Sequence, residues 1–322
     1  MRATLRLWFA VALTLATACA PALVREEPRA RPHVWLSPLY RDHPLAGRIW
    51  DVGHRRWLDE RTLESNLRRA DFVLLGETHD NLDHHRLEAS LVRSIASKGR
   101  RPALAFEMLS TDQQPAVDAA LAHHPGDPDL LALAVDWAHS GWPPFSEYRP
   151  VFAAGLDRHL RIVAADLSPT EALAVVHHGR AALAAAAQQE LVALPPKLEA
   201  EWREEMRQSH CGALPERFLG PMVLAQRARD LRLATALLQA AGKDGAILVT
   251  GAGHARTDRG VPTILARQAP QRTTLAVAFV EVRPDAVTPE AYGRFPYDFV
   301  VFTPATARED PCRELRTHPL PR

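Results

Sequence analysis

Short, uninterrupted apolar runs alternate with longer amphipathic stretches along most of the chain. The runs have the character of buried strands and lie at 72–75, 103–106, 162–165, 246–250, 274–280 and 299–302. Helical spacing of apolar residues predicts helices over about 83–98, 112–122, 129–139, 170–193, 197–208 and 221–241. Such alternation predicts an α/β fold with a mostly parallel central sheet and helices on both faces.

Four of the predicted strands end at an acidic residue or a histidine. Glu77 and His79 follow the first strand, Glu107 the second, Asp166 the third, and His254 comes shortly after the fourth. In open α/β sheets, ligands bind beyond the carboxyl ends of the strands. The sequence therefore predicts a ligand site at the strand carboxyl ends, assembled from separate segments.

The turn after the first strand carries the densest chemistry. Gly76 permits a tight turn, and Asn81 is suited to cap the next helix. Glu77 and His79 are two residues apart on an extended turn, so both can face one cavity, as metal binding or acid–base chemistry requires. The structural alternative is that Glu77 binds its own loop and His79 is an ordinary half-buried histidine.

Further histidines and an arginine lie close to these turns. His84 and His85 open the predicted helix, and because adjacent helical residues diverge by about 100°, only one, His84, is expected to face His79. His254 follows a Gly-Ala-Gly turn and precedes Arg256, an arrangement able to hold an anion.

The segment 141–150 is rich in aromatic residues and proline and is predicted to be irregular. Trp142 and Phe145 are suited to line an apolar pocket. Tyr148 is a candidate phenolate ligand for ferric iron, because the adjacent Arg149 should lower the phenol pKa. The alternative is a loop that fills the core around a hydrogen-bonded tyrosine.

A polar stripe in the predicted helix 221–241 joins Gln226, Arg229 and Asp230. Their spacing of three to four residues places them on one side of the helix. We expect this stripe to be a solvated face with salt bridges.

The first residues have the pattern of an export signal. Arg2 and Arg6 precede an apolar run too short to span a bilayer, and Cys19 ends a lipobox-like sequence. We expect residues 1–18 to be a lipoprotein signal peptide and Cys19 to be lipidated, with outer-membrane anchoring because Ala20 is not aspartate. The alternative is a secretory signal cut after Ala18.

Composition divides the rest of the chain and limits its partners. The Pro- and Arg-rich residues 19–47 are predicted to be a tether, 48–305 one α/β domain, and 306–322 a tail. With 39 basic and 38 acidic residues and no basic tract interleaved with aromatics, nucleic acid is not an expected partner. Cys211 and Cys312 would be either disulfide-bonded or free.

Taken in order, several motifs resemble the ChaN-like family over residues 48–282. They are Gly76-Glu-Thr-His-Asp-Asn81 with His84-His85, Phe106-Glu-Met108, Trp142-Pro with Tyr148-Arg-Pro150, His210-Cys-Gly-Ala-Leu-Pro215, Gln226-Arg-Ala-Arg-Asp230, and Gly251-Ala-Gly-His254-Ala-Arg256 with Gly260-Val-Pro262.

The resemblance implies a haem-binding lipoprotein of iron uptake, with haem held at the interface of a homodimer by a tyrosine and a nearby histidine. It carries the haem-ligand role to Tyr148, with His84 or His85 as partner. Trp142 and Arg256 would supply an apolar surface and a cation for the propionates.

The same family is related to the Tiki metalloproteases, which use two Gly-x-x-His motifs, and to the erythromycin esterases. These relatives imply a catalytic or divalent-metal site at Glu77, His79, Glu107 and His254. The leading hypothesis is a haem-binding envelope lipoprotein, and the competing one is a metal-dependent hydrolase. A scaffold with neither activity is the third.

Overall fold

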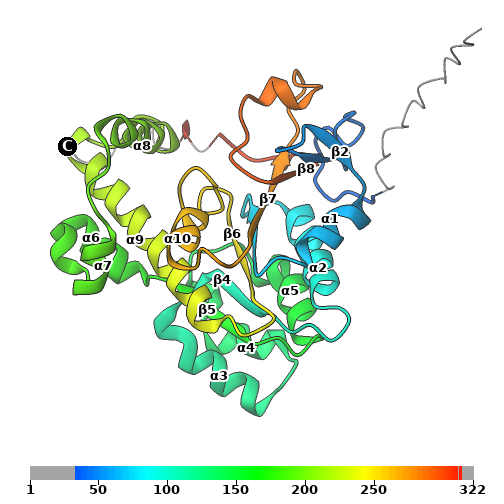
Figure 1. The fold of residues 1–322 in the computed structure, drawn as a ribbon, viewed down its shortest axis with the longest axis horizontal. Helices are drawn as coiled ribbons and strands as arrows, with labels where there is room; N and C mark the ends of the chain where they lie inside the picture. Colours follow the sequence, from blue (N-terminus) through cyan, green and yellow to red (C-terminus); the bar gives the residue numbers. More distant parts are fainter. Residues whose placement is uncertain (1–32, 311, 314–322) are drawn as a thin grey trace, which may run out of the picture.

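The computed structural model describes residues 33–310 and 312–313. Its sheet has eight strands in the order β2-β1-β8-β7-β3-β6-β4-β5. The strands from β8 to β5 are all parallel, and β1 and β2 add an antiparallel edge (Figure 1). Their bounds are β1 Ile49–Asp51, β2 Arg56–Leu58, β3 Phe72–Glu77, β4 Ala103–Ser110, β5 Ile162–Asp166, β6 Ala246–Gly251, β7 Thr274–Glu281 and β8 Phe299–Thr303.

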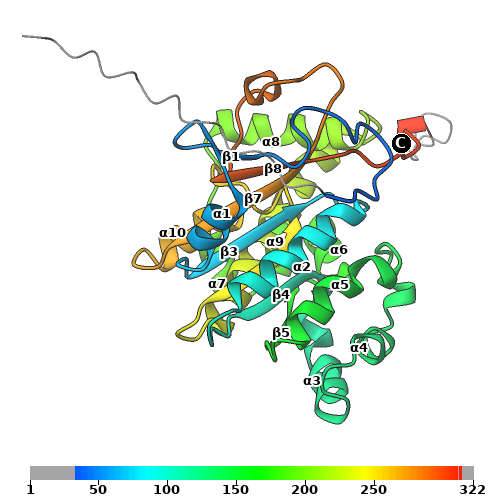
Figure 2. The same cartoon turned by 90° about the vertical axis from the view of Figure 1, so that its right-hand side faces the viewer.

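Helices cover both faces of this sheet, as the views in Figures 1 and 2 show. One face carries α1, α2 and α5, and the other carries α6, α9 and α10. The predicted α/β fold is therefore confirmed. The bounds are α1 Glu60–Leu67, α2 Leu82–Ile95, α3 Gln114–His123, α4 Pro128–Ala134, α5 Phe145–Leu156, α6 Pro169–His178, α7 Ala185–Glu190, α8 Pro196–Ser209, α9 Glu216–Ala240 and α10 Val261–Gln268.

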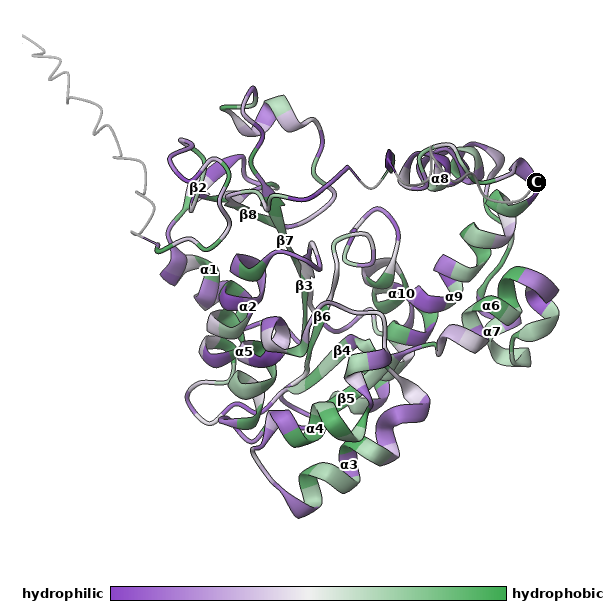
Figure 3. Ribbon diagram, turned by 180° about the vertical axis from the view of Figure 1, so that it is seen from behind, coloured by the Kyte–Doolittle hydropathy of each residue, from purple (hydrophilic) through white to green (hydrophobic). Residues whose placement is uncertain are grey.

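Apolar side chains on the two faces of the sheet build two separate cores. Val73 and Leu75 of β3 point toward α2 and α5, whereas the alternate residues Phe72 and Leu74 point toward α9 and α10. This alternation follows from the two-residue period of a strand. Both faces are covered, so the central strands are apolar throughout, and they appear largely green in Figure 3.

Three predicted elements differ from the structure. The helix predicted over 129–139 is interrupted, because α4 ends at Ala134 and Asp136 has a φ of 52°. The segment predicted to be irregular, 141–150, ends in α5, which contains Pro150. A proline inside a helix removes one hydrogen bond, but burial of Val151 and Phe152 against the core offsets that loss. The predicted helix 170–193 is broken at Gly179, whose φ of 61° ends α6.

The described part of the predicted tether is packed on the domain. The backbone N–H groups of Leu36 and Ser37 donate to the carboxylate of Asp83 at 2.8–3.1 Å, Leu39 pairs with Ala305, and Leu45 is 1% exposed. Residues 33–47 are therefore part of the folded unit. The predicted signal peptide and Cys19 lie outside the described residues.

The described end of the chain also returns to the domain. Arg308 forms ion pairs with Asp80 and Glu281, each at 2.7 Å. Cys312 forms a disulfide with Cys211, with 5.4 Å between the Cα atoms and 101 residues of separation. This bond joins the last described residues to the turn between α8 and α9 (Figure 1). In the described part of the chain, no helix has the length and apolar character needed to cross a bilayer.

Candidate functional site at the strand carboxyl ends

The end of β3 holds a buried carboxylate with an imidazole and a phenol. Oε1 of Glu77 accepts a hydrogen bond from the Tyr148 hydroxyl at 2.7 Å and lies 2.9 Å from Nδ1 of His79. The imidazole of His79 is therefore oriented by Glu77, and its Nε2 has no hydrogen-bond partner among the described residues. The side chain of His79 is 32% exposed, whereas Glu77 is buried.

Glu107, at the end region of β4, is the centre of a second group of contacts. Its Oε2 accepts from the Thr250 hydroxyl and from the backbone N–H of Gly251, both at 2.6 Å. Its Oε1 accepts from Arg229 at 2.7 Å, and the same guanidinium pairs with Asp166 at 2.5 Å. Arg229 of α9 thus joins a carboxylate within β4, Glu107, to the carboxylate that ends β5, Asp166.

His254 completes the cluster from the turn after β6. Its Nδ1 lies 2.6 Å from Oδ1 of Asp230, and its Nε2 lies 3.5 Å from Oε1 of Glu107. The side-chain nitrogen of Gln226 is 3.0 Å from the same Nε2. His254 is therefore held by a carboxylate on one side, as His79 is held by Glu77.

The two carboxylate–histidine pairs meet at Glu107. Nε2 of His79 lies 3.9 Å from Oε1 of Glu107, the oxygen that His254 also approaches. The structure thus brings together the four residues that the sequence placed at one site. We call Glu77, His79, Glu107, Asp166, Arg229, Asp230 and His254 the strand-end cluster.

Burial and mutual charge set the protonation states in this cluster. Burial raises the pKa of Glu77, but the hydrogen bond to His79 and the close contact with His85, whose Nε2 lies 2.9 Å from Oε2, outweigh this and hold it at about 2. Burial lowers the pKa of His254, yet Glu107 and Asp230 raise it to about 10. Burial also lowers the pKa of His79, and the bond to Glu77 and the charge of Glu107 raise it overall. Burial raises the pKa of Glu107 as well, but His254 and Arg229 outweigh this and hold it well below its ordinary value. Glu77 and Glu107 are therefore ionised and His254 is protonated at neutral pH.

The polar stripe of α9 was predicted to be solvated, and that prediction is wrong. Gln226, Arg229 and Asp230 all contact the cluster, and Asp230 is 3% exposed. The stripe faces inward because α9 packs along β4, β5 and β6 at their carboxyl ends. The strand-end acids could have indicated this arrangement, because buried carboxylates such as Glu107 and Asp166 require a paired cation, and Arg229 is suited to that role.

Tyr148 lies where no phenolate is favoured. Its side chain is fully buried, and burial together with the charge of Glu77 raises the pKa of its hydroxyl far above the ordinary value. Arg149 does not lower that pKa, because Arg149 points away and pairs with the exposed Asp129 at 2.8 Å. The expectation of a pKa lowered by Arg149 is therefore wrong.

The paired histidines of α2 have opposite surroundings. His84 was expected to face His79, but its Nδ1 accepts from the backbone N–H of Thr78 and its Nε2 meets the hydroxyl of Thr303, both at 2.9 Å. Burial lowers the pKa of His84 to about 4. His85 faces the cluster instead and packs against Tyr148, with ring centroids 4.0 Å apart and ring planes tilted by 33°.

The two remaining haem candidates also differ. Trp142 lies edge-on against His79, with the ring centroids 4.8 Å apart and an angle of 63° between the ring planes. Arg256 pairs with Asp258 at 2.8 Å and does not contact the cluster. Trp142 is thus at the site, and Arg256 is not.

A cavity of about 750 Å³ opens directly onto the cluster. Glu107, Asp166 and Arg229 form its polar wall. The rest is largely apolar and includes Met108, Trp142, Leu173, Val176, Trp202, Met206 and Met222. This size and lining are typical of small-molecule sites.

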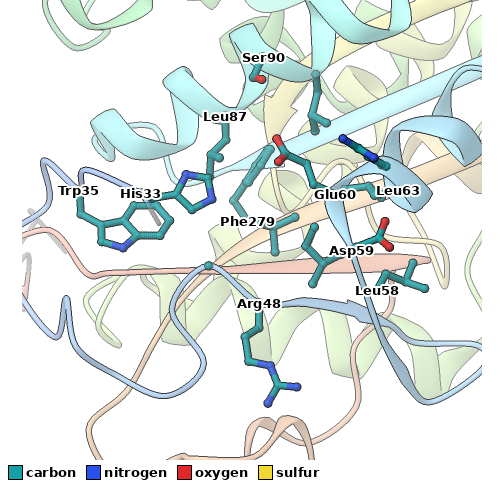
Figure 4. Close-up of a pocket in the computed structure, with 15 residues that line it drawn as sticks. His33, Trp35, Arg48, Leu58, Asp59, Glu60, Leu63, Leu87, Ser90 and Phe279 are labelled. Atoms are coloured by element: carbon teal, nitrogen blue, oxygen red, sulfur yellow. The ribbon is translucent and has the colours of Figure 1, made fainter. Parts of the chain in front are cut away.

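A second cavity, of about 210 Å³, lies away from the cluster and is drawn in Figure 4. Trp35, Leu87 and Phe279 contribute apolar walls, and the charged residues Arg48 and Glu60 also line it. None of the strand-end residues lines it.

A family model described as "Haem-binding uptake, Tiki superfamily, ChaN" matches residues 63–265, more than half of the chain. The chain belongs to this family. The family match runs from α1 into α10 and includes every residue of the strand-end cluster. The resemblance to ChaN-like proteins is therefore confirmed.

Among solved structures, the chain is similar to ChaN of Campylobacter jejuni, described with cofacial haem binding. The identity is 20%, the TM-score 0.63, and the alignment covers 79% of this chain and 95% of that one. This likeness shows the fold. An erythromycin esterase mutant in its open conformation aligns at 16% identity and a TM-score of 0.40, over 80% of this chain and 82% of its own. No curated protein matches the chain.

Proposed function

We propose that this protein binds haem as a lipid-anchored component of the cell envelope, in haem or iron uptake. Membership of the ChaN family supports haem binding, and the lipobox-like sequence ending at Cys19 supports the anchor. Haem needs an apolar slot, an axial donor and positive charge for its propionates. The chain's own residues fit each of these needs.

The axial donor is the observation on which the proposal depends most. Nε2 of His79 makes no hydrogen bond within the described residues, while Nδ1 is fixed by Glu77 at 2.9 Å. An imidazole held by a carboxylate through one nitrogen is a common metal ligand through the other. Tyr148 would have to lose a proton and its bond to Glu77 before it could bind iron, so His79 is the preferred ligand.

The surroundings of His79 suit a flat apolar ligand. Trp142 packs edge-on against the imidazole and lines the large cavity. Arg229 and Arg259 line the same cavity, where they pair with Glu107 and Asp166 and with Glu205, so a haem propionate would compete with these carboxylates for the guanidinium groups.

The test is a haemin titration of the purified protein, followed by the Soret absorbance. We expect His79→Ala to abolish the shift or to weaken binding strongly, and Tyr148→Phe to preserve it. His139→Ala is the matched control, because His139 is exposed and, among the described residues, its side chain pairs with Asp136 alone. An unchanged titration in His79→Ala would overturn the ligand assignment, and no shift in the wild type would overturn haem binding.

Two accompanying proposals concern location and assembly. Cys19→Ala should release the protein from the membrane fraction, whereas fractionation unchanged by this substitution would contradict lipid anchoring. Haem shared between two copies should double the sedimenting mass on haemin addition. A mass that stays constant would contradict the homodimer.

The convergence of two carboxylate–histidine pairs favours a second function, hydrolysis. In this reading His79 takes a proton from water as the water oxygen adds to a carbonyl carbon of the substrate. Protonated His254 and Arg229 stabilise the oxyanion, and the proton then passes to the leaving group as its bond breaks. A divalent cation held by Glu77, His79, Glu107 and His254 is the metal-dependent form of this hypothesis. The guanidinium of Arg229, 2.7 Å from Glu107, favours the metal-free form.

Hydrolysis is tested with chromogenic ester and peptide substrates, with and without a chelator. Activity that resists the chelator and is lost in His79→Ala supports the metal-free form, and activity lost with the chelator supports the metal-dependent form. No turnover above that of His79→Ala would remove the hydrolase hypothesis.

A further inference from the structure

A second group of polar side chains lies behind Glu77, away from the cavity. His85 and Glu88 are three residues apart on α2 and so lie on one side of that helix, which packs beside β3 (Figure 2). Together with Glu77 they offer ligand atoms that all lie within 4.8 Å of one another. We call Glu77, His85 and Glu88 the buried triad. Its members are at most 3% exposed.

The polar atoms of the buried triad are only partly satisfied by the described protein. Neither oxygen of Glu88 and neither ring nitrogen of His85 makes a hydrogen bond of normal geometry in the described structure. Nε2 of His85 and Oε2 of Glu77 are 2.9 Å apart, yet they are not aligned as donor and acceptor. An unsatisfied buried polar group destabilises the fold, so a cluster of this kind calls for a missing partner.

We propose that the buried triad binds one divalent cation of the zinc type, through the carboxylates of Glu77 and Glu88 and the imidazole of His85. Carboxylate and imidazole donors suit such ions, and three protein ligands leave one position of a tetrahedral shell open. This site is separate from the proposed haem ligand and goes beyond the proposed function.

The charges balance with a dication present. The ionised carboxylates of Glu77 and Glu88 carry two negative charges, and the neutral imidazole of His85 carries none. One dication would therefore neutralise the triad. Without an ion, burial and the neighbouring charge of Glu77 raise the pKa of Glu88 well above its ordinary value, so that Glu88 carries a proton. The competing account of the triad is therefore a proton held between two carboxyl groups, and the experiment below separates the two.

The two oxygens of Glu77 serve different partners. Oε1 is taken by His79 and Tyr148, whereas Oε2 is directed toward His85 and makes no hydrogen bond. Tyr148 also packs against His85, so it orients two of the three ligands. Metal sites typically include a side chain like this one, which does not bind the ion itself but orients the residues that do.

The lack of exposure determines how the ion must enter. His85 and Glu88 are 0% exposed, so binding would accompany folding. The zinc should therefore be supplied during expression, or during refolding of the whole chain, and chelators should remove it slowly from the folded protein.

The first experiment measures zinc per chain in haem-free protein refolded with zinc and then desalted. We expect about one zinc in the wild type, about one in Glu107→Gln, and none in Glu88→Gln. The two substitutions are matched, since both change a buried glutamate to glutamine, and only Glu88 belongs to the triad. Zinc retained in Glu88→Gln would overturn the proposal. Absence of zinc from the wild type would also overturn it and would favour the competing account, a proton held between the carboxyl groups of Glu77 and Glu88.

A second measurement needs no substitution and so does not depend on the folding of a variant. X-ray absorption at the zinc edge of the wild type should show nitrogen and oxygen ligands near 2.0–2.1 Å with a single histidine. Two histidines would place the ion at His79 and His254 and overturn the triad as the site. Haemin is then added to the same samples, and haem binding is followed by the Soret band. Failure of the zinc proposal can therefore be distinguished from failure of the haem proposal.

Discussion

Gly251 is the position at which the strand-end cluster is most sensitive to a single methyl group. A Cβ atom placed on Gly251 would lie 2.8 Å from Nε2 and 3.2 Å from Cε1 of His79. The backbone there is not in the left-handed region, so Gly251→Ala brings no backbone strain of that kind. The substitution therefore acts on the imidazole and leaves the fold in place.

The size of the effect follows from the contact. The imidazole must retreat by about 0.6 Å to reach the 3.4 Å of ordinary contact. That movement disturbs the 2.9 Å bond between Nδ1 and Glu77. A hydrogen bond to a charged group contributes about 1.5–3 kcal/mol, which corresponds to about a ten- to hundredfold weaker affinity for a ligand bound through His79.

The assay is a haemin titration of Gly251→Ala beside Gly253→Ala. Gly253 lies in the same turn, and a Cβ there would meet no atom within 4 Å. We expect the affinity to fall about ten- to hundredfold only in Gly251→Ala, with unfolding temperatures that differ little between the two variants. Equal haem affinity in both variants would refute the reasoning, because His79 would then not be the group that contacts the ligand.

Three other predictions concern stability. Because the pKa of His254 is raised from 6.5 to about 10, its contribution is complete below pH 6.5 and is lost as the pH rises toward 10; urea unfolding should show this decline in the wild type and a flatter profile in His254→Gln. Arg229→Met leaves two buried carboxylates without their cation and should lower the free energy of unfolding by about 3–5 kcal/mol. The control Arg232→Met, on the solvated side of α9, should lower it by less than about 1 kcal/mol. Equal losses of stability in the two variants would contradict the role assigned to Arg229. Reduction of the Cys211–Cys312 bond, which closes a loop of about 100 residues, should lower stability by up to about 4–5 kcal/mol, and unchanged urea unfolding would show that the bond contributes little.

The sequence predicted the sheet well because its central strands are buried on both faces. A strand such as 72–77 is apolar at every position, and a polar residue at its end is conspicuous. The antiparallel strands β1 and β2 are three residues each and carry no such pattern, so the sequence did not indicate them.

The side-chain partners were harder to predict than the strand ends. Helical spacing placed Arg229 and Asp230 on one side of a helix, but spacing does not reveal what that side faces. The choice between His84 and His85 depended on the rotation of α2 about its axis, which is set by packing against α5 and β3. Glu88 was overlooked because a single glutamate in an amphipathic helix is normally exposed.

The attachment of residues 36 and 37 to Asp83 determines where a shortened chain can begin. A recombinant protein started at residue 48, where the sequence pattern alone would place the domain boundary, loses all three backbone N–H contacts of the Asp83 carboxylate. Asp83 is 2% exposed and lies in the first turn of α2, four residues after His79. Such a protein would keep every residue of the strand-end cluster while loosening the turn that orients it, so a start at or before residue 33 is the sound choice for binding studies.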